Sequence, residues 1–231
     1  MILAENRTPI ASILVPPALL DDRSSPALYA AKELRYYLGR MTAASFKIEA
    51  DDGSETGISL NFADKTDELG DDGFTIDSEG ERVVIRGGVR GIIYGAYELL
   101  EILGCRFFTH NCEKVPTILA PELPELHVRQ KPIVEYREHN YADLTQNNRF
   151  SVKRRFNGSS HRIPKHMGGN MSYAWFVHTF DHMVPASVYG ESHPEYFAMV
   201  DGKRVTTDRG RTQLCLTNPE VLELCIESAR K

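Results

Sequence analysis

The chain has 231 residues, of which 42% are hydrophobic and 26% are charged, a composition typical of a globular protein with a sizeable core. Its net charge of -5 at pH 7 gives no basis for binding nucleic acid, so no nucleic-acid partner is expected. No apolar stretch approaches the roughly 20 residues that span a bilayer, and no membrane partner is expected either.

The start of the chain, "MILAENRTPIASILVPPALLDD", lacks a basic segment followed by an apolar core and a small-residue cleavage site. It therefore does not resemble a signal peptide. This predicts a cytoplasmic location if the N-terminus is native, and an exported protein if a leader has been removed.

Predicted strands and helices alternate from Ser12 to about Thr117. The run "SILVP" predicts a strand, and "LYAAKELRYYLGRM" at 28–41 has the spacing of an amphipathic helix, capped by the preceding "SSP". "DGFTIDSEGERVVIRGG" at 72–88 predicts a β-hairpin, and "RGIIYGAYELLEILG" at 90–104 predicts a second helix. This order predicts a small α/β sandwich with the helices against one sheet.

The composition changes after about residue 116. Residues 119–132 are punctuated by prolines and indicate a linker or an extended crossing segment. Histidines, aromatic residues and asparagines then crowd into 136–197, as is typical of functional loops. "NPEVLELCIESARK" at 218–231 predicts an amphipathic helix that begins at an Asn-Pro cap.

Residues 178–182 read "HTFDH", and two histidines four apart on a helix could bind one zinc ion. The zincin motif, however, has glutamate directly after its first histidine, where this chain has Thr179. The preceding "YAWFV" predicts a buried strand, which places His178 at a strand end. Two interpretations rank above metal binding: a hydrogen-bonded structural histidine and a histidine that contacts substrate. We predict no metal site and no cofactor.

Aromatic side chains beside polar groups suit sugar rings, whose C–H faces stack on indole while their hydroxyls form hydrogen bonds. Trp175 and Tyr141 are candidates for such stacking, with His178 as a pocket-lining contact. For each aromatic residue alone, ordinary core packing is the alternative. His182 and His193 are expected to hold the loop "VPASVYGESHPEYF" in place.

Two stretches resemble known families. "DGFTIDSEGERVVIRGGVRGIIYGAYELLEILGCRFF" resembles the non-catalytic α/β domain that precedes the catalytic barrel in family-20 β-hexosaminidases and family-67 α-glucuronidases. "HTFDHMVPASVYGESHPEYFAMVDGKR", followed by "QLCLTNPEVLE", resembles a domain of unknown function found in large bacterial glycan-processing proteins, some of them grouped as family-163 endo-β-N-acetylglucosaminidases.

The resemblance implies an α/β domain at 1–118, a linker at 119–132 and the start of a (β/α)8 barrel at 133–231. A closed barrel takes about 250 residues, so the barrel would be incomplete here. "IVEYREHN" would be its first strand, with Arg137 resembling an arginine that holds sugar hydroxyls. The predicted substrate-binding residues are Arg137, His139, Asn140, Trp175 and His178.

The function that this resemblance implies is the N-terminal portion of a glycoside hydrolase acting on N-acetylglucosamine-containing or related glycans. Hydrolysis needs two acids, or one acid with a substrate acetamido group. Such acids generally lie on middle barrel strands, so the catalytic residues are expected beyond residue 231 and the chain alone is expected to be inactive. The region contains Glu138, Asp143, Asp181 and Glu195, and Glu195 is expected to fix a loop. The alternatives are a non-catalytic carbohydrate-binding or scaffolding module and, ranked below it, a zinc hydrolase.

Overall fold

The computed structural model describes residues 1–53, 56–64, 68–173, 175, 178–207 and 213–231. The chain divides into two compact units, Met1–Met171 and Ser172–Lys231. The sequence places the division between domains elsewhere, at a linker covering 119–132, and that division stays a prediction. Within the described residues, no helix is long and apolar enough to cross a membrane.

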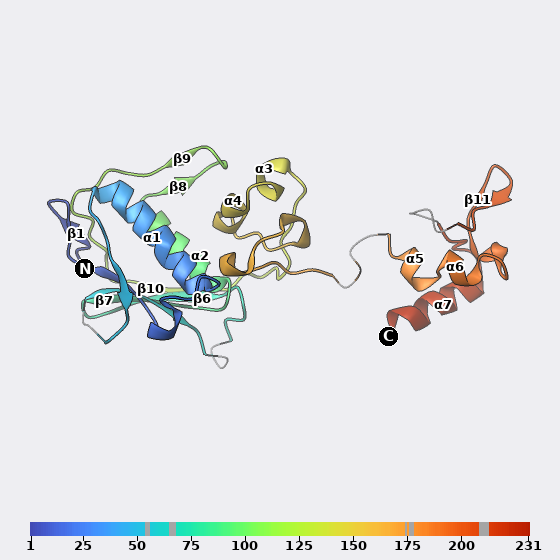
Figure 1. The fold of residues 1–231 in the computed structure, drawn as a ribbon, viewed down its shortest axis with the longest axis horizontal. Coiled ribbons are helices and arrows are strands. Elements are labelled where there is room, and N and C mark those ends of the chain that lie inside the picture. Colours follow the sequence, from blue (N-terminus) through green and yellow to red (C-terminus); the bar gives the residue numbers. More distant parts are fainter. Residues whose placement is uncertain (54–55, 65–67, 174, 176–177, 208–212) are drawn as a thin grey trace. The chain divides into compact units, whose positions relative to one another are not determined.

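In the described part of the first unit, six strands form one sheet in the order β10-β6-β7-β5-β3-β4. Figure 1 labels β6, β7 and β10 of this sheet. The pairs β3–β4, β3–β5 and β5–β7 are parallel, whereas β6 is antiparallel to both β7 and β10. The sheet is therefore mostly parallel, and the α/β class is confirmed. The strands are β3 (Ser12–Val15), β4 (Ile48–Ala50), β5 (Gly57–Phe62), β6 (Phe74–Glu79), β7 (Arg82–Gly87) and β10 (His127–Gln130).

The predicted hairpin is confirmed as β6 and β7, paired from Phe74 opposite Gly87 to Glu79 opposite Arg82. Only two residues connect the strands. The first of them, Gly80, has a φ of 65°, a conformation that glycine adopts at little cost in a tight hairpin turn. The hairpin is thus specified by local sequence.

Both predicted helices are confirmed, as α1 (Pro26–Thr42) and α2 (Gly91–Ile102). The hydroxyl of Ser25 caps α1 by accepting a hydrogen bond from the amide of Leu28. Figure 1 shows the two helices on one face of the sheet. The apolar stripe that the sequence assigns to α1 is buried throughout: Leu28, Ala31, Leu34, Leu38 and Met41.

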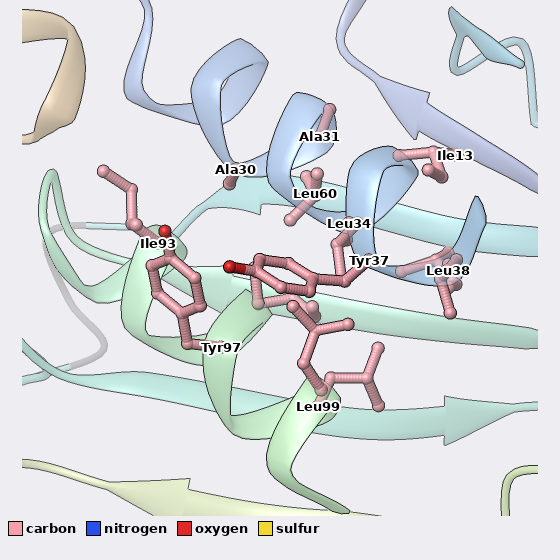
Figure 2. Close-up of a cluster of buried hydrophobic side chains, with 14 of the residues drawn as sticks. Ile13, Ala30, Ala31, Leu34, Tyr37, Leu38, Leu60, Ile93, Tyr97 and Leu99 are labelled. Atoms are coloured by element: carbon pink, nitrogen blue, oxygen red, sulfur yellow. The ribbon is translucent and has the colours of Figure 1, made fainter. Parts of the chain in front are cut away.

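The core of the first unit lies between these helices and the sheet (Figure 2). Full burial of each large aliphatic side chain contributes about 1.5–3 kcal/mol. The side chains labelled in the figure come from both helices and from the sheet: Ile13, Ala30, Ala31, Leu34, Tyr37, Leu38, Leu60, Ile93, Tyr97 and Leu99.

The turn from β7 into α2 contains the "GGVRG" motif, and its glycines allow two backbone segments to touch. A Cβ atom on Gly91 would lie 1.9 Å from the carbonyl oxygen of Gly73, and one on Gly88 would lie 2.0 Å from that of Gly70. The amide of Gly91 donates to the carbonyl of Asp71 at 2.8 Å. The motif is therefore explained by close packing of the backbone.

Part of the predicted linker is the edge strand β10, which pairs with β6. Residues 133–171 pack into the same unit, with Phe150, Val152 and Ile163 joining its core. The remaining short elements of the unit are β1 (Ala4–Glu5), β2 (Thr8–Pro9), η1 (Pro17–Leu19), β8 (Arg106–Phe107), β9 (Glu113–Lys114), α3 (Ala142–Thr145), α4 (Asn148–Lys153), η3 (Ser159–His161) and η4 (Lys165–Met167).

Residues 133–140, expected to be the first barrel strand, form no strand in this structure. Their hydrogen bonds go to a nearby loop instead. The amide of Arg137 donates to Oδ1 of Asn157 at 2.8 Å, and its carbonyl accepts from the amides of Asn157 and Gly158, both at 3.1 Å. The barrel as a whole stays a prediction.

The second unit has a small core of its own, made by Val184, Ala186, Tyr196, Phe197, Leu214 and Val221. The predicted C-terminal helix is confirmed as α7 (Pro219–Ala229), and the side chain of Asn218 caps it by accepting from the amide of Glu220. The other elements are α5 (Phe180–Met183), α6 (Ala186–Tyr189), η5 (Pro194–Tyr196), β11 (Met199–Val200) and β12 (Lys203–Arg204).

Candidate functional site

The five predicted substrate-binding residues fall in both units. Arg137, His139 and Asn140 belong to the first unit, whereas Trp175 and His178 belong to the second. The candidate site therefore consists of two groups of residues, one in each unit, and the contacts of each group are described separately.

The guanidinium group of Arg137 is held in place by the protein. Its Nη2 donates to Oδ1 of Asp72 at 2.9 Å, and the group lies over the ring of Tyr94, 5.9 Å from the ring centre. Three backbone carbonyls accept its other hydrogen bonds, at 2.7–2.9 Å: those of Val134, Glu135 and Arg155. Arg137 is thus preorganised by contacts on every side.

Asp72 is the acceptor at the centre of these contacts, and sequence reasoning did not single it out. Its buried carboxylate accepts from Nε of Arg90 at 2.8 Å, from Arg137, and from Nδ2 of Asn157 at 3.4 Å. Burial alone would raise the pKa of Asp72, but the hydrogen bonds and charges of Arg90 and Arg137 outweigh it and lower the pKa. Asp72 is therefore ionised at neutral pH.

Glu138 lies beside Arg137 and is also surrounded by donors. It accepts from the amide of Ser160 at 2.9 Å and from its hydroxyl at 2.7 Å, and from the hydroxyls of Tyr136 and Ser159. Burial would raise the pKa of Glu138, but these hydrogen bonds leave it below its ordinary value. A general acid at neutral pH requires a raised pKa, so this carboxylate is suited to fixing the loop.

His139 and Asn140 follow in the same segment, and His139 is half-buried. The Nδ1 atom of His139 accepts from the amide of Tyr141 at 2.9 Å, and its ring meets those of Tyr141 and Phe156 edge-on, with ring centres 4.8 Å apart in each pair. Asn140 is exposed, and its Oδ1 accepts from the hydroxyl of Ser160 at 3.4 Å. Asn140 presents a polar group to solvent beside the aromatic contacts of His139.

In the second unit, Trp175 is 38% exposed and its ring is stacked on that of His182, with ring centres 5.9 Å apart and planes inclined by 12°. Tyr173, two residues earlier, is 56% exposed, and His178 is exposed as well. We call Tyr173, Trp175, His178 and His182 the aromatic surface. Three residues of the predicted strand "YAWFV", Ala174, Phe176 and Val177, lie outside the described residues.

The "HTFDH" stretch is not one continuous helix. His178 precedes α5 and has a φ of 55°, whereas His182 lies within α5. The two imidazoles therefore do not share a helix face. Across the described part of the chain, no group of three or more His, Cys, Asp or Glu side chains is placed to hold a metal ion.

His193 occupies the loop that precedes β11. Its ring stacks on that of Tyr196, with centres 4.6 Å apart, and its Nδ1 lies 3.0 Å from Oε1 of Glu195. The hydroxyl of Tyr196 donates to Oε2 of Glu220 in α7 at 2.5 Å. These contacts connect the loop to the C-terminal helix.

A second polar cluster in the first unit is centred on Glu113. Its carboxylate accepts from the hydroxyl of Tyr37 at 2.7 Å, from Nζ of the buried Lys153 at 3.0 Å, and from Arg40. Burial opposes ionisation of Glu113, but these three donors lower its pKa to about 2. The cluster connects α1 to α4 by charge-assisted hydrogen bonds.

This cluster predicts a pH dependence of stability. A carboxyl whose pKa is depressed on folding stabilises the protein above its unfolded pKa and loses that contribution as the pH falls toward the folded value. We expect Glu113 to contribute about 2 kcal/mol at pH 6, allowing for solvent screening, and to lose this between about pH 4.5 and 2. Urea denaturation of Glu113→Gln across this range should show a flatter pH profile than the unsubstituted protein. Replacing the exposed Glu122 by glutamine should leave the profile unchanged, and equal profiles for the protein and Glu113→Gln would contradict the assignment.

Fold and site together define a mixed α/β protein with a small second unit that carries exposed aromatic and histidine side chains. Residues 107–231 match the family described as "Domain of unknown function (DUF4838)". The match covers more than half of the chain, which belongs to this family. The predicted presence of a domain of unknown function is thereby confirmed, whereas the relationship to families 20, 67 and 163 stays a prediction.

Among solved structures, one similar chain is described as a "GH138 enzyme targeting pectin rhamnogalacturonan II". It is 22% identical, with a TM-score of 0.28, over 38% of this chain and 9% of its own length. This chain thus spans a small part of that enzyme, and a likeness at this level carries no argument about function. No curated protein matches the chain.

Proposed function

We propose that the chain is the glycan-recognising N-terminal portion of a glycoside hydrolase that acts on N-acetylglucosamine-containing or related glycans, with the catalytic acids beyond residue 231. The observation that carries the proposal is the exposure of Trp175 within the aromatic surface. The resemblance of the "HTF", "HPEYF", "DGKR" and "LCLTNPEV" motifs to glycan-processing proteins supports the choice of ligand.

An exposed indole is suited to a sugar because the ring presents a flat apolar face to the C–H groups of a pyranose. The stack on His182 fixes the orientation of the indole before any ligand arrives. The exposed imidazole of His178, three residues further on, can form hydrogen bonds with sugar hydroxyls. Arg137, His139 and Asn140 belong to the same proposal as polar sugar contacts on the first unit.

A second candidate function is a non-catalytic carbohydrate-binding module. It is favoured because three carboxylates in the region of the predicted contacts are engaged with other side chains. Glu138 is held ionised by four hydrogen bonds, Glu195 is paired with His193, and Asp143 contacts His110. These three carboxylates therefore serve structural contacts. Both candidates share glycan recognition by the aromatic surface and differ in whether a longer gene product cleaves the glycan.

Trp175 is the only tryptophan in the sequence, so its intrinsic fluorescence reports directly on this surface. We expect an oligosaccharide of β-linked N-acetylglucosamine, or an N-glycan, to change this fluorescence saturably. Calorimetry should show about tenfold weaker binding for Trp175→Ala, because the stacking contact is lost, and a smaller loss for Trp175→Phe. Phe108→Ala, a change at an exposed aromatic residue outside the predicted substrate-binding residues, is the matched control.

The same titrations test the histidines. His178→Ala should weaken glycan binding more than His182→Ala, and equal or reversed effects would overturn the assignment of His178. Binding that is unchanged in Trp175→Ala would count against the aromatic surface. The hydrolase proposal fails if a gene product extending past residue 231 releases no sugar from N-glycans or uronic-acid oligosaccharides, and the binding-module proposal then stands alone.

A further inference from the structure

A basic pocket is lined by residues of the first unit. Its volume is about 530 Å³, and it is lined by residues at the start of β6, in α2 and β10, in the segment 131–137 and directly after α4. Five of its lining residues are basic and one is acidic: Arg129, Lys131, Arg137, Arg154, Arg155 and Asp72. This concentration of positive charge stands out in a chain whose net charge is -5.

Nearby acids reduce the positive charge of the pocket without cancelling it. Asp72 pairs with Arg137 and also with Arg90, which adds a further positive charge behind the pocket wall. Arg155 pairs with Glu98 and lies 3.8 Å from Glu101. Arg90 also pairs with Asp71, at 3.2 Å. Six basic groups thus face four acids, and the excess of positive charge favours an anion.

Two of the guanidinium groups are held in fixed orientations. Arg155 lies over the ring of Phe74 at 5.5 Å and donates to Oε1 of Gln130 at 2.7 Å, while Arg137 lies over the ring of Tyr94. Guanidinium groups always carry a positive charge that attracts oxyanions, and those already positioned lose little freedom when a ligand arrives.

We propose that this pocket binds an oxyanion group carried by a saccharide, either the carboxylate of a uronic acid or a sulfate ester. The oxyanion chemistry follows from the pocket itself, whereas the saccharide carrier rests on the proposed function. Lys131 and the exposed Arg154 contribute charge and hydrogen-bond donors at the pocket, and Arg137 and Arg155 contribute positive charge in fixed positions.

The test is calorimetric titration of the full chain at low ionic strength with inorganic sulfate, glucuronate, N-acetylglucosamine 6-sulfate and neutral N-acetylglucosamine. The three anions should bind saturably and weaken as salt is added, whereas the neutral sugar should not bind at this pocket. The double variant Lys131→Gln, Arg154→Gln should bind the anions about tenfold more weakly or worse. Both positions carry polar side chains away from the core, so the variant keeps the groups that support the fold. Comparing the affinities for glucuronate and for the sulfated sugar shows whether the pocket prefers a uronic-acid carboxylate or a sulfate ester.

Arg23→Gln is the matched control, because Arg23 is exposed and lies outside the pocket. The proposal is overturned if no anion binds saturably, if the double variant binds as the unsubstituted protein does, or if Arg23→Gln weakens binding equally. Trp175→Ala should leave the binding of inorganic sulfate unchanged. If the proposed function is wrong, the neutral glycans will fail to bind in the titrations that follow Trp175, whereas binding of inorganic sulfate to the pocket will be unaffected. The two proposals are therefore tested separately.

Discussion

Asp72→Ala is expected to lower the free energy of unfolding by about 3–5 kcal/mol, because it leaves the buried guanidinium group of Arg90 with only the exposed carboxylate of Asp71. The same change removes an acceptor from Arg137 and from Asn157. Urea denaturation followed by circular dichroism measures the loss. Asp72→Asn, which keeps an acceptor but not the charge, should fall between the alanine variant and the unsubstituted protein.

The neighbouring acid provides a matched control. Asp71 also contacts Arg90, at 3.2 Å, but its side chain is 64% exposed. Exposed ion pairs contribute about 1 kcal/mol or less, so Asp71→Ala should be nearly neutral. Equal losses for the two alanine variants would show that burial of the Asp72 carboxylate is not what stabilises this cluster.

Gly91→Ala is the second substitution with a large expected effect. Its Cβ would lie 1.9 Å from the carbonyl oxygen of Gly73, and a backbone atom cannot move aside as a flexible side chain can. We expect a loss of about 3 kcal/mol, because α2 must shift away from the segment before β6. Thermal and urea denaturation check the loss, and near-ultraviolet circular dichroism reports any rearrangement around Tyr94 and Tyr97.

Gly39→Ala is the control for Gly91, since Gly39 also belongs to a helix but its Cβ would meet only the carbonyl oxygen of Ala44, at 3.3 Å. Alanine favours helix by up to about 1 kcal/mol, so this variant should lie within about 1 kcal/mol of the unsubstituted protein. A loss in Gly39→Ala as large as that in Gly91→Ala would indicate that added volume alone, and not contact with Gly73, explains the effect.

The elements that sequence patterns predict are those built from local interactions. The hairpin needs only a two-residue connection with Gly80, and α1 has its cap and apolar stripe within one segment. β10 was not predicted as a strand because its four residues carry no strong strand pattern and are ordered by the open edge of β6. The predicted strand at 133–140 was wrong for a similar reason, since its hydrogen bonds go to residues 157–158.

The site shows the same division between local and distant contacts. Trp175 and His178 could be chosen as candidates because residue type and spacing are read directly from the sequence. Asp72 could not, because its partners Arg137 and Asn157 are 65 and 85 positions away and no local pattern joins them. The basic pocket was missed as well, since it gathers residues from segments that are far apart in the sequence.

The β10 edge strand has a consequence for the order of folding. The β6–β7 hairpin closes a very short loop, whereas the β10 segment must find β6 across a separation such as the 48 positions between Leu126 and Ser78. Closing a longer loop loses more chain entropy, so we expect β10 to pair after the hairpin has formed. Until it does, β6 offers unpaired backbone groups to other chains, and refolding at high protein concentration favours aggregation through this edge.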